Sequence, residues 1–460
     1  MSKDEEPSTP LWSAAIAIGR ERLAARDRSR LVGLGLTWLG ALIAVEGLRH
    51  HAQVTTFTGI AVLLAARGLA VGRRLTFTHV ALSFSLVLLA KWFYSDDHLR
   101  MTCLVLVCAG IALVLPGLPP MPGTDEQRRQ IWSLVEQTAR DPLAPFALRT
   151  DKSYFFSADQ QAAVAYRVRF GTAVVSGDAI GDPASRESAL EGFLAHAYAE
   201  GWRVAALGVS ERDLPLWKSR GFWSVSIGRD VVIDIEQFSM EGRRFRNLRQ
   251  AVQRTANAGI TSEIVAEAQL LPEVRAELEA ILNLKRTPDR GFAMILDRPL
   301  AGVHPGTVIA VARDQDGRIV AAARYATADD GREVSLDIPW RVPGAPNGAD
   351  ERLVADMITW AQERGGQRLS LAFAAFPDLF AMPDRSAVQA TAHWGVHLLD
   401  PLIKLESLYR YLRKFHAFDQ KRYVVLRRRH VVPAAVTMLV FEFALLGPLK
   451  LIPGRNRRAS

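Results

Sequence analysis

Cysteine is scarce in this chain of 460 residues, and its scarcity excludes several kinds of site. The two cysteines, Cys103 and Cys108, lie inside one apolar run. Two thiols are too few for a structural zinc site, and a five-residue spacing places them on different faces of a helix. No other group of potential ligands has metal-site spacing. We therefore expect no metal, and we interpret both thiols as packed or lipid-facing side chains.

The chain also lacks an excess of acidic residues. Lysine and arginine number 57 against 48 aspartates and glutamates, which gives a formal net charge of +9. This excess favours anionic partners such as tRNA or phospholipid, and it carries no information about the fold.

Four apolar runs fill the first quarter of the chain: Leu31–Leu48, Ala52–Val71, Phe77–Tyr94 and Met101–Leu118. Each approaches the roughly 20 residues that cross a bilayer core. Buried helices of a soluble protein are the alternative, but such helices show a polar face with a period of about 3.6 residues, and these runs do not. We predict a basic segment at 1–30 and a bundle of about four transmembrane helices at 31–120.

The orientation of these predicted helices follows from the arginines beside them. Arginines cluster before the first run, between the second and third, and after the fourth, at 20–30, 73–74 and 128–129. The positive-inside rule then places both ends of the bundle in the cytoplasm. The basic N-terminus is too long for a signal peptide, and no small-residue cleavage site follows the first run. The sequence therefore predicts a multi-pass protein of the cell (plasma) membrane with a cytoplasmic soluble domain.

From about Gly123 the pattern changes to alternating strands and amphipathic helices. Glycines at expected helix ends, such as Gly201 and Gly221, and the turn at Asp316-Gly317 separate the elements. The expected strands are 162–170, 172–176, 203–209, 231–235, 308–312, 320–325, 334–338 and 369–373, and the expected helices are 186–200, 211–220, 272–284 and 351–364. The sequence thus predicts two α/β domains, at 121–241 and 259–430.

A basic amphipathic helix is expected to join the two domains over residues 242–258. Phe245, Leu248 and Val252 lie on one face at helical spacing, and arginines occupy the remainder. A helix of this kind is usually a solvated face. The alternative is a phosphate track, because the planar guanidinium group matches phosphate geometry with two hydrogen bonds. Both interpretations stay open at this point.

The C-terminal region combines cations and aromatic rings around one carboxylate. Residues 404–415 hold Glu406 among lysines, arginines and tyrosines, and a second cationic group follows at 421–423. This combination is typical of polyanion binding. Residues 431–452 are then mostly apolar and flanked by arginines, but prolines interrupt them. We expect 431–460 to form a membrane-associated segment that lies at the interface rather than making one clean span.

An ordered succession of motifs runs through the soluble region. The motifs are Ser176-Gly177-Asp178 through Pro183, Gly221-Phe222, Asn247–Ala251, Asp289–Met294, Ser335-Leu336-Asp337, Pro346-Asn347-Gly348, Glu406–Tyr409, Lys414-Phe415 and Arg422-Tyr423. In order and spacing, residues 151–423 resemble the C-terminal synthase domain of the phosphatidylglycerol lysyltransferases, the multiple peptide resistance factor family. The resemblance implies an α/β (α+β) fold of tandem acetyltransferase-like (GNAT) domains that use no acetyl-CoA or other cofactor.

The resemblance also implies a reaction. Family members move an aminoacyl group from aminoacyl-tRNA to a hydroxyl of phosphatidylglycerol, which weakens the attraction of cationic antimicrobial peptides to the membrane. The expected partners are therefore aminoacyl-tRNA, an anionic phospholipid and the membrane itself. This transesterification needs a proton acceptor, donors for the developing oxyanion, and cations for the phosphates of both substrates.

Residues at the matching positions are the candidates for these tasks. Asp337 is the first choice for the catalytic carboxylate, and Glu406 is the second. Either could instead hold the ammonium group of the amino acid. The structural alternatives are a turn at Asp337 and an ion pair of Glu406 with Lys404 or Arg410. The candidate substrate-binding residues are Asn247, Arg249, Arg341, Asn347, Tyr409, Arg413, Lys414 and Arg422.

Some positions depart from the family pattern. That pattern has an arginine three residues after the aspartate, where this chain has Trp340, with Arg341 next to it. Such departures keep two alternatives open. One is a noncatalytic, membrane-tethered relative that binds tRNA or lipid. The other is an acyl-CoA-dependent N-acetyltransferase, whose pyrophosphate loop has its nearest match at 341–346, where prolines remove backbone donors.

Overall fold

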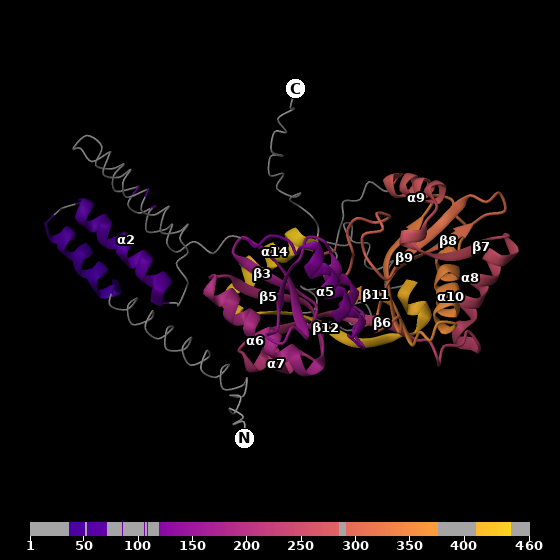
Figure 1. The fold of residues 1–460 in the computed structure, drawn as a ribbon, viewed down its shortest axis with the longest axis horizontal. Helices are drawn as coiled ribbons and strands as arrows, with labels where there is room; N and C mark the ends of the chain where they lie inside the picture. Colours follow the sequence, from indigo (N-terminus) through magenta and orange to yellow (C-terminus); the bar gives the residue numbers. More distant parts are fainter. Residues whose placement is uncertain are drawn as a thin grey trace, which may run out of the picture. The chain divides into compact units, whose positions relative to one another are not determined.

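The computed structural model describes residues 36–50, 53–70, 119–284, 291–375 and 411–442, together with single positions at 85, 105 and 108. The chain divides into two compact units. The first comprises residues 1–119 with 194–203, and the second comprises the remainder. Figure 1 shows the elements of both units.

Two helical segments form most of the described part of the first unit, at 36–49 and in α2 (Gln53–Ala70). They pack closely through small residues, since a Cβ atom added to Gly47 would lie 2.4 Å from the backbone nitrogen of Thr56. Large apolar side chains of the 36–49 helix are exposed: Trp38, Leu39, Leu42, Val45 and Leu48. The helix pair therefore has small residues at its contact and large apolar side chains on its outer surface.

Among the described residues, no helix combines the length and the apolar character needed to cross a membrane. The first and second predicted spans are described only in part. The third and fourth, at 77–94 and 101–118, lie almost entirely outside the described residues. The four transmembrane helices therefore stay a prediction.

One mixed sheet runs through the second unit. Its order is β1-β2-β3-β5-β12-β6-β11-β10-β9-β8-β7, with β4 paired to β2. The strands are β1 (Ser153–Phe156), β2 (Ala162–Arg169), β3 (Thr172–Ser176), β4 (Ile180–Gly181), β5 (Arg203–Ser210), β6 (Trp223–Asp234), β7 (Thr261–Ala266), β8 (Thr307–Arg313), β9 (Ile319–Ala328), β10 (Glu333–Arg341), β11 (Arg368–Ala375) and β12 (Phe418–Leu426). β10 and β11 pair in parallel, whereas β12 is antiparallel to both of its neighbours.

Helices cover both faces of the part of the sheet formed by β7 to β11. The helices described after residue 119 are α5 (Asp125–Glu136), α6 (Pro183–Ala199), α7 (Leu214–Ser219), α8 (Arg246–Asn257), α9 (Pro272–Leu284), α10 (Ala349–Gln362) and α14 (Val431–Glu442), with short 3-10 turns η2 (Ala144–Leu148), η3 (Arg243–Phe245), η4 (Glu267–Gln269), η5 (Arg413–Phe415) and η6 (Arg428–His430). In β8, Ala310 and Ala312 pack on the side of α8 and α10, while Ile309 and Val311 pack on the side of α9. This period of two is expected for a strand buried on both faces.

The last strand, β12, lies in the middle of the sheet. It pairs with β5 through Arg422–Leu426 and with β6 over most of its length. A strand from late in the chain thus completes the part of the sheet formed by β1 to β6. The domains predicted at 121–241 and 259–430 contribute to one sheet, and their boundaries stay a prediction.

Most of the predicted elements are present. The helix predicted at 272–284 is α9, and the strands predicted at 162–170 and 172–176 are β2 and β3. Strand β6 begins at Trp223, well before the predicted start at 231. The prediction missed its first half because that half is largely exposed and forms no apolar run. The sequence pattern does not predict α5, β1, β7 or β12.

Candidate functional site

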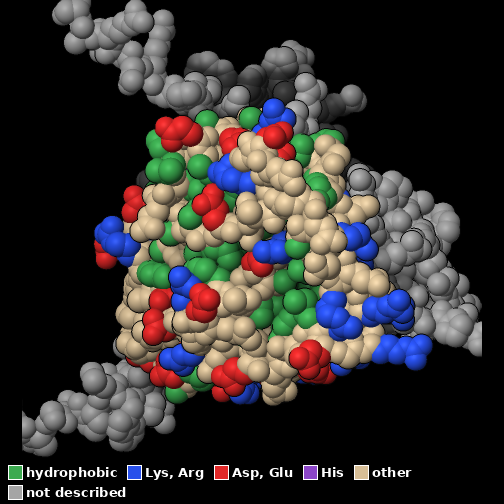
Figure 2. Space-filling model, turned by 90° about the vertical axis from the view of Figure 1, so that its right-hand side faces the viewer, with side chains coloured by type: hydrophobic (Ala, Val, Ile, Leu, Met, Phe, Trp, Pro, Cys, Tyr) green, Lys and Arg blue, Asp and Glu red, His purple; other side chains and the backbone are tan. Residues whose placement is uncertain are grey.

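The predicted joining helix is present as η3 and α8, and it exposes its arginines. Leu248, Ala251 and Thr255 form the buried face of α8, and no acidic residue occurs in the helix. The exposed arginines are Arg243, Arg244, Arg246, Arg249 and Arg254. In Figure 2, Lys and Arg side chains gather along one margin of the visible face. The arginines are solvated, as both interpretations of this helix require, and the charge that α8 exposes is of one sign.

The cationic segment at η5 lies beside this helix. The Arg244 guanidinium donates to the His416 carbonyl at 2.8 Å, and the Phe245 and His416 rings are 5.9 Å apart. Arg413 and Lys414 are exposed. Two distant segments thus form one cationic surface, called here the α8–η5 surface, which consists of Arg243, Arg244, Arg246, Arg249, Arg254, Arg413 and Lys414.

The start of α10 packs against the same surface. Gly348 has φ +108°, and a Cβ atom there would lie 2.4 Å from the Ala251 carbonyl of α8, so only glycine fits this contact. Glu351 in the first turn of α10 forms an ion pair with Lys414 at 2.6 Å. These contacts join the loop that carries Asn347 to α8, which carries Asn247 and Arg249, and join α10 to Lys414 of η5.

Arg341 binds its own loop. Its guanidinium donates to the Ala345 carbonyl at 2.8 Å and to Asn347 Oδ1 at 3.1 Å. Trp340, which stands where the family pattern has an arginine, is 1% exposed and packs in the core beneath α9. This position is a core position here, and Arg341 stabilises the loop that follows it.

The loop between β10 and α10 does not form a pyrophosphate cradle. Pro343 and Pro346 have no N–H, and the amides of Ala345 and Ala349 donate to carbonyls within the loop. Two acidic residues in the first turn of α10 also oppose an anion at this helix end. The geometry therefore disfavours the acyl-CoA alternative.

Asp337 lies on β10 inside a buried ion network. Its Oδ2 accepts a hydrogen bond from Arg324 at 2.9 Å, and its Oδ1 accepts one from the Leu296 amide at 2.8 Å. Arg324 also binds Glu267 at 2.8 Å, and these three ionisable side chains are fully buried. Burial raises the pKa of Asp337 to about 6, despite the neighbouring Arg324. Both oxygens of this carboxylate are engaged, and its catalytic role stays a prediction.

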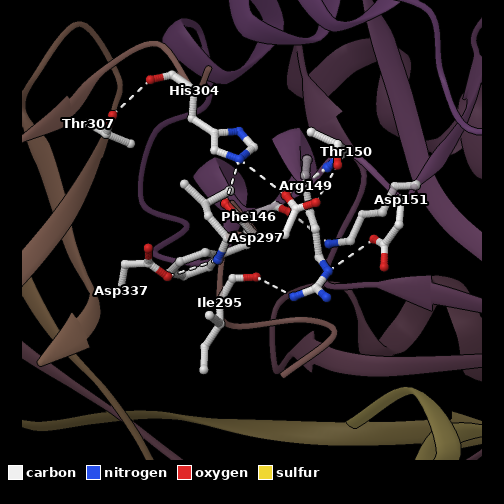
Figure 3. Close-up of polar contacts among 12 residues, drawn as sticks. Phe146, Arg149, Thr150, Asp151, Ile295, Asp297, His304, Thr307 and Asp337 are labelled. Atoms are coloured by element: carbon white, nitrogen blue, oxygen red, sulfur yellow. Dashed lines mark hydrogen bonds and ion pairs between the residues drawn. The ribbon is translucent and has the colours of Figure 1, made fainter. Parts of the chain in front are cut away.

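A second polar group lies beside Asp337 and was missed by sequence reasoning (Figure 3). Asp297 accepts from the Thr150 amide at 3.0 Å and lies 3.1 Å from His304 Nε2. Burial opposes its charge, but hydrogen bonds from His304 and Thr150 hold the pKa of Asp297 below its usual range. Arg149 donates to the Ile295 carbonyl at 3.2 Å. The segment that carries Asp297 is thereby fixed to the turn between η2 and β1.

Arg422 is fully buried on β12. Its guanidinium forms ion pairs with Asp230 at 2.7 Å and Asp141 at 2.9 Å, and it lies 3.6 Å from Asp178. Burial opposes its charge, but these carboxylates raise the pKa of Arg422 above its usual value. Burial, together with Asp213 and Asp141, raises the pKa of Asp178 to about 7. The donors of Arg422 serve this core network, so it lies apart from the α8–η5 surface.

Lys152 is a further buried cation that the sequence pattern does not predict. Its Nζ donates to the Phe146 carbonyl at 2.7 Å and to Ser176 Oγ at 2.6 Å, and it lies 5.0 Å from the centre of the Phe292 ring. Burial lowers the pKa of Lys152 to about 7. The motifs that contain Ser176 and Phe292 therefore meet at this lysine.

Two predicted site residues, Glu406 and Tyr409, lie outside the described residues, in the chain between β11 and η5. Their roles stay predictions. Within the part of the chain that the structure describes, no group of three or more histidine, cysteine or acidic side chains is arranged to hold a metal ion.

Sequence comparison identifies relatives along most of this chain. The model of the family described as phosphatidylglycerol lysyltransferase, C-terminal, matches residues 132–426. The MprF-like domain protein Rv1619 of Mycobacterium tuberculosis is 46% identical over 454 residues, which cover 92% of each chain. The lysylphosphatidylglycerol biosynthesis bifunctional protein LysX of Mycobacterium avium is 30% identical over 352 residues, which cover 75% of this chain and 30% of LysX. The chain thus spans less than a third of LysX.

Solved structures share the fold. L-PGS from Bacillus licheniformis has a TM-score of 0.59 and 19% identity, and the match covers 70% of this chain and 98% of that one. The C-terminal domain of a putative lysylphosphatidylglycerol synthetase from Agrobacterium fabrum has a TM-score of 0.58 and 20% identity, with coverage of 69% and 98%. The predicted resemblance is confirmed: the chain belongs to the phosphatidylglycerol lysyltransferase (C-terminal) family, a family of transferases that aminoacylate lipid.

Proposed function

We propose that the chain is a membrane-associated aminoacyltransferase that moves an amino acid from aminoacyl-tRNA to a hydroxyl of phosphatidylglycerol or a related anionic lipid. Family membership supports the lipid as acceptor. The observation that supports aminoacyl-tRNA as the donor is the α8–η5 surface, where two segments that are distant in sequence expose cations side by side. Closely spaced lysines and arginines suit the phosphates of an RNA backbone.

The proposed reaction assigns distinct tasks to the two candidate carboxylates. The lipid hydroxyl attacks the ester carbonyl of the aminoacyl-tRNA, the ester bond to the ribose breaks, and the hydroxyl proton passes through a base to the departing ribose oxygen. We assign the base to Glu406. Asp337 is proposed as a positioning residue, because its oxygens hold Arg324 and the Leu296 amide. It would keep the Asp297 segment in place beside the substrates.

Membrane association is the second part of the proposal. The helix pair formed by 36–49 and α2 supports it, because small residues at the contact and large apolar side chains outside suit helices surrounded by lipid. The predicted spans at 31–120, a cytoplasmic catalytic domain and tandem GNAT-like halves belong to the same proposal.

Mass spectrometry of total lipids, from cells that express or lack the chain, tests donor and acceptor together. We expect an aminoacylated form of phosphatidylglycerol that requires the chain. Asp337→Asn should lower its amount and shift the pH profile of transfer, whereas Glu279→Gln, at an exposed position on α9, should not. No aminoacylated lipid, with the chain in the membrane and charged tRNA present, would contradict the proposal.

A noncatalytic binder is the second candidate function. Trp340 favours it, since this buried indole replaces an arginine of the family pattern and Arg341 is engaged within its own loop. This alternative predicts that the chain binds tRNA and anionic vesicles with no change in cellular lipids.

A further inference from the structure

The C-terminal helix α14 has one buried and one exposed apolar face. Ala434, Met438 and Phe441 pack in a core cluster with residues of β3, β5 and β12. On the other side Val432 is 72% exposed, and Val436 and Leu439 are 49% and 42% exposed. These three lie at spacings of four and three residues, which is one stripe of a helix. The stripe is a continuous line of apolar surface open to solvent.

Arginines and an exposed tryptophan lie at the start of this helix. Arg428 and Arg429 are exposed on η6, directly before α14. The Arg428 guanidinium lies 5.8 Å from the centre of the Trp223 ring, and Trp223 is 42% exposed. Tryptophan is enriched at the headgroup level of membranes, and arginines there are attracted to anionic lipids.

The register of the sheet explains why Trp223 lies beside α14. Trp223 of β6 is the direct partner of Leu426 of β12. Directly paired residues of antiparallel strands point to the same face of a sheet. Leu426 packs in the cluster that α14 covers. Trp223 therefore lies on the same face of the sheet as α14, at the end where η6 begins.

The α8–η5 surface differs in its apolar content. Among the described residues of η3, α8 and η5, no large hydrophobic side chain is exposed. The two surfaces also lie at opposite ends of β12, since η5 precedes this nine-residue strand and η6 follows it. A strand of this length spans about 30 Å, at roughly 3.3 Å per residue. The apolar cationic surface and the polar cationic surface are thus separate.

We propose that Trp223, Arg428, Arg429, Val432, Val436 and Leu439 form a docking face for the surface of an anionic phospholipid bilayer, called here the η6–α14 face. The occupant is argued from the pairing of apolar burial with cationic attraction, the two signals that together hold a protein at a membrane surface. The proposal rests on the proposed function and deepens it, because it specifies which part of the transferase domain meets the lipid.

The test uses the full chain reconstituted in vesicles. A Cys103→Ser/Cys108→Ser background carries Val436→Cys, labelled with an environment-sensitive fluorophore. A matched label at Ala256→Cys, exposed on α8, is the control. Emission is measured in phosphatidylcholine vesicles with and without phosphatidylglycerol, and quenching by brominated lipid reports depth.

We expect a blue shift and quenching at position 436 only, stronger with phosphatidylglycerol, and loss of that lipid dependence in Arg428→Gln/Arg429→Gln. Equal emission at 436 and 256 would overturn the proposal. So would a blue shift that is equal in both lipids, or one that appears without vesicles and grows with protein concentration, which would indicate a second copy on this face. Lipid aminoacylation is not the readout, so failure of the proposed reaction leaves this test valid.

Discussion

The α8–η5 surface and the η6–α14 face are both rich in arginine, and they flank the same strand, β12. On the first, the exposed charges stand among polar neighbours, and the apolar side chains of α8 are turned into the core. On the second, arginines stand beside Trp223 and an exposed stripe of valine and leucine. Charge alone indicates an anionic partner. Exposed apolar side chains beside the charge favour a lipid surface, and polar surroundings favour nucleic acid.

Between the two surfaces, β12 carries the buried Arg422, and removing this cation should have the largest effect. Arg422→Met would leave Asp141 and Asp230 buried without their partner, at a cost of about 3–5 kcal/mol of unfolding free energy. Urea unfolding followed by circular dichroism measures this loss. Arg254→Met, which removes an exposed cation from α8, should change stability by less than about 0.5 kcal/mol. Equal losses would mean that the buried network does not hold the sheet together.

The core between the surfaces should also respond to pH. Burial raises the pKa of Asp178 and Glu333 to about 7 and that of Asp337 to about 6. The folded state therefore holds protons that the unfolded chain releases above about pH 4. The stabilisation from these groups is fully present below the unfolded pKa and is lost as pH rises from there through the folded pKa values of 6 to 7, by about 1 kcal/mol per pH unit for each group.

Urea midpoints measured between pH 5 and pH 7 would show this fall in stability; above pH 7 the buried Lys152, whose pKa burial lowers to about 7, adds the opposite slope. Asp178→Asn should flatten the slope, because the amide needs no proton to be neutral. Stability that rises with pH over this range would show that the folded chain releases these protons instead.

Removing charge from the α8–η5 surface should weaken RNA binding in a salt-dependent way. Arg243→Gln/Arg246→Gln should lower the slope of log affinity against log salt by about 2, one for each lost phosphate contact. Fluorescence anisotropy with a labelled tRNA measures it. Arg428→Gln/Arg429→Gln removes the same charge from the other surface, and an equal change of slope there would end the distinction between the two.

The smallest effect is expected at Lys414, which is already paired with Glu351 and is partly exposed. Lys414→Ala should cost less than about 1 kcal/mol of stability, the usual size for an exposed ion pair. It should also weaken RNA binding less than Arg243→Gln does, since its charge is partly compensated. A larger loss of RNA affinity at Lys414 would place the centre of the RNA site at η5 rather than at α8.

Local pattern predicted much of the fold, because apolar periodicity records which side chains face the core. It failed where a strand is largely exposed, as in the first half of β6, and where pairing is long-range. The insertion of β12 between β5 and β6 joins residues about 200 positions apart, and no local period encodes that choice of partner.

The site was predictable only in part, for a related reason. The cations of α8 and η5 stand out in the sequence as clusters of arginine and lysine, and both clusters lie in motifs that resemble the family. The buried partners were missed, although Arg324 inside an apolar strand is a signal, because a fully buried arginine requires a carboxylate. Which carboxylate it binds depends on tertiary packing. Arg422 shows the opposite error, since its place in a cationic segment suggested a surface ligand, yet the structure buries it.

The central claim is that the two cationic surfaces take different partners, and paired charge removal tests it most directly. The variants Arg243→Gln/Arg246→Gln and Arg428→Gln/Arg429→Gln are compared in one full-chain preparation for tRNA affinity and for lipid-dependent emission at position 436. The account predicts that the first variant loses tRNA affinity and keeps the emission change, while the second does the reverse. Loss of both signals in either variant, to the same degree, would contradict it.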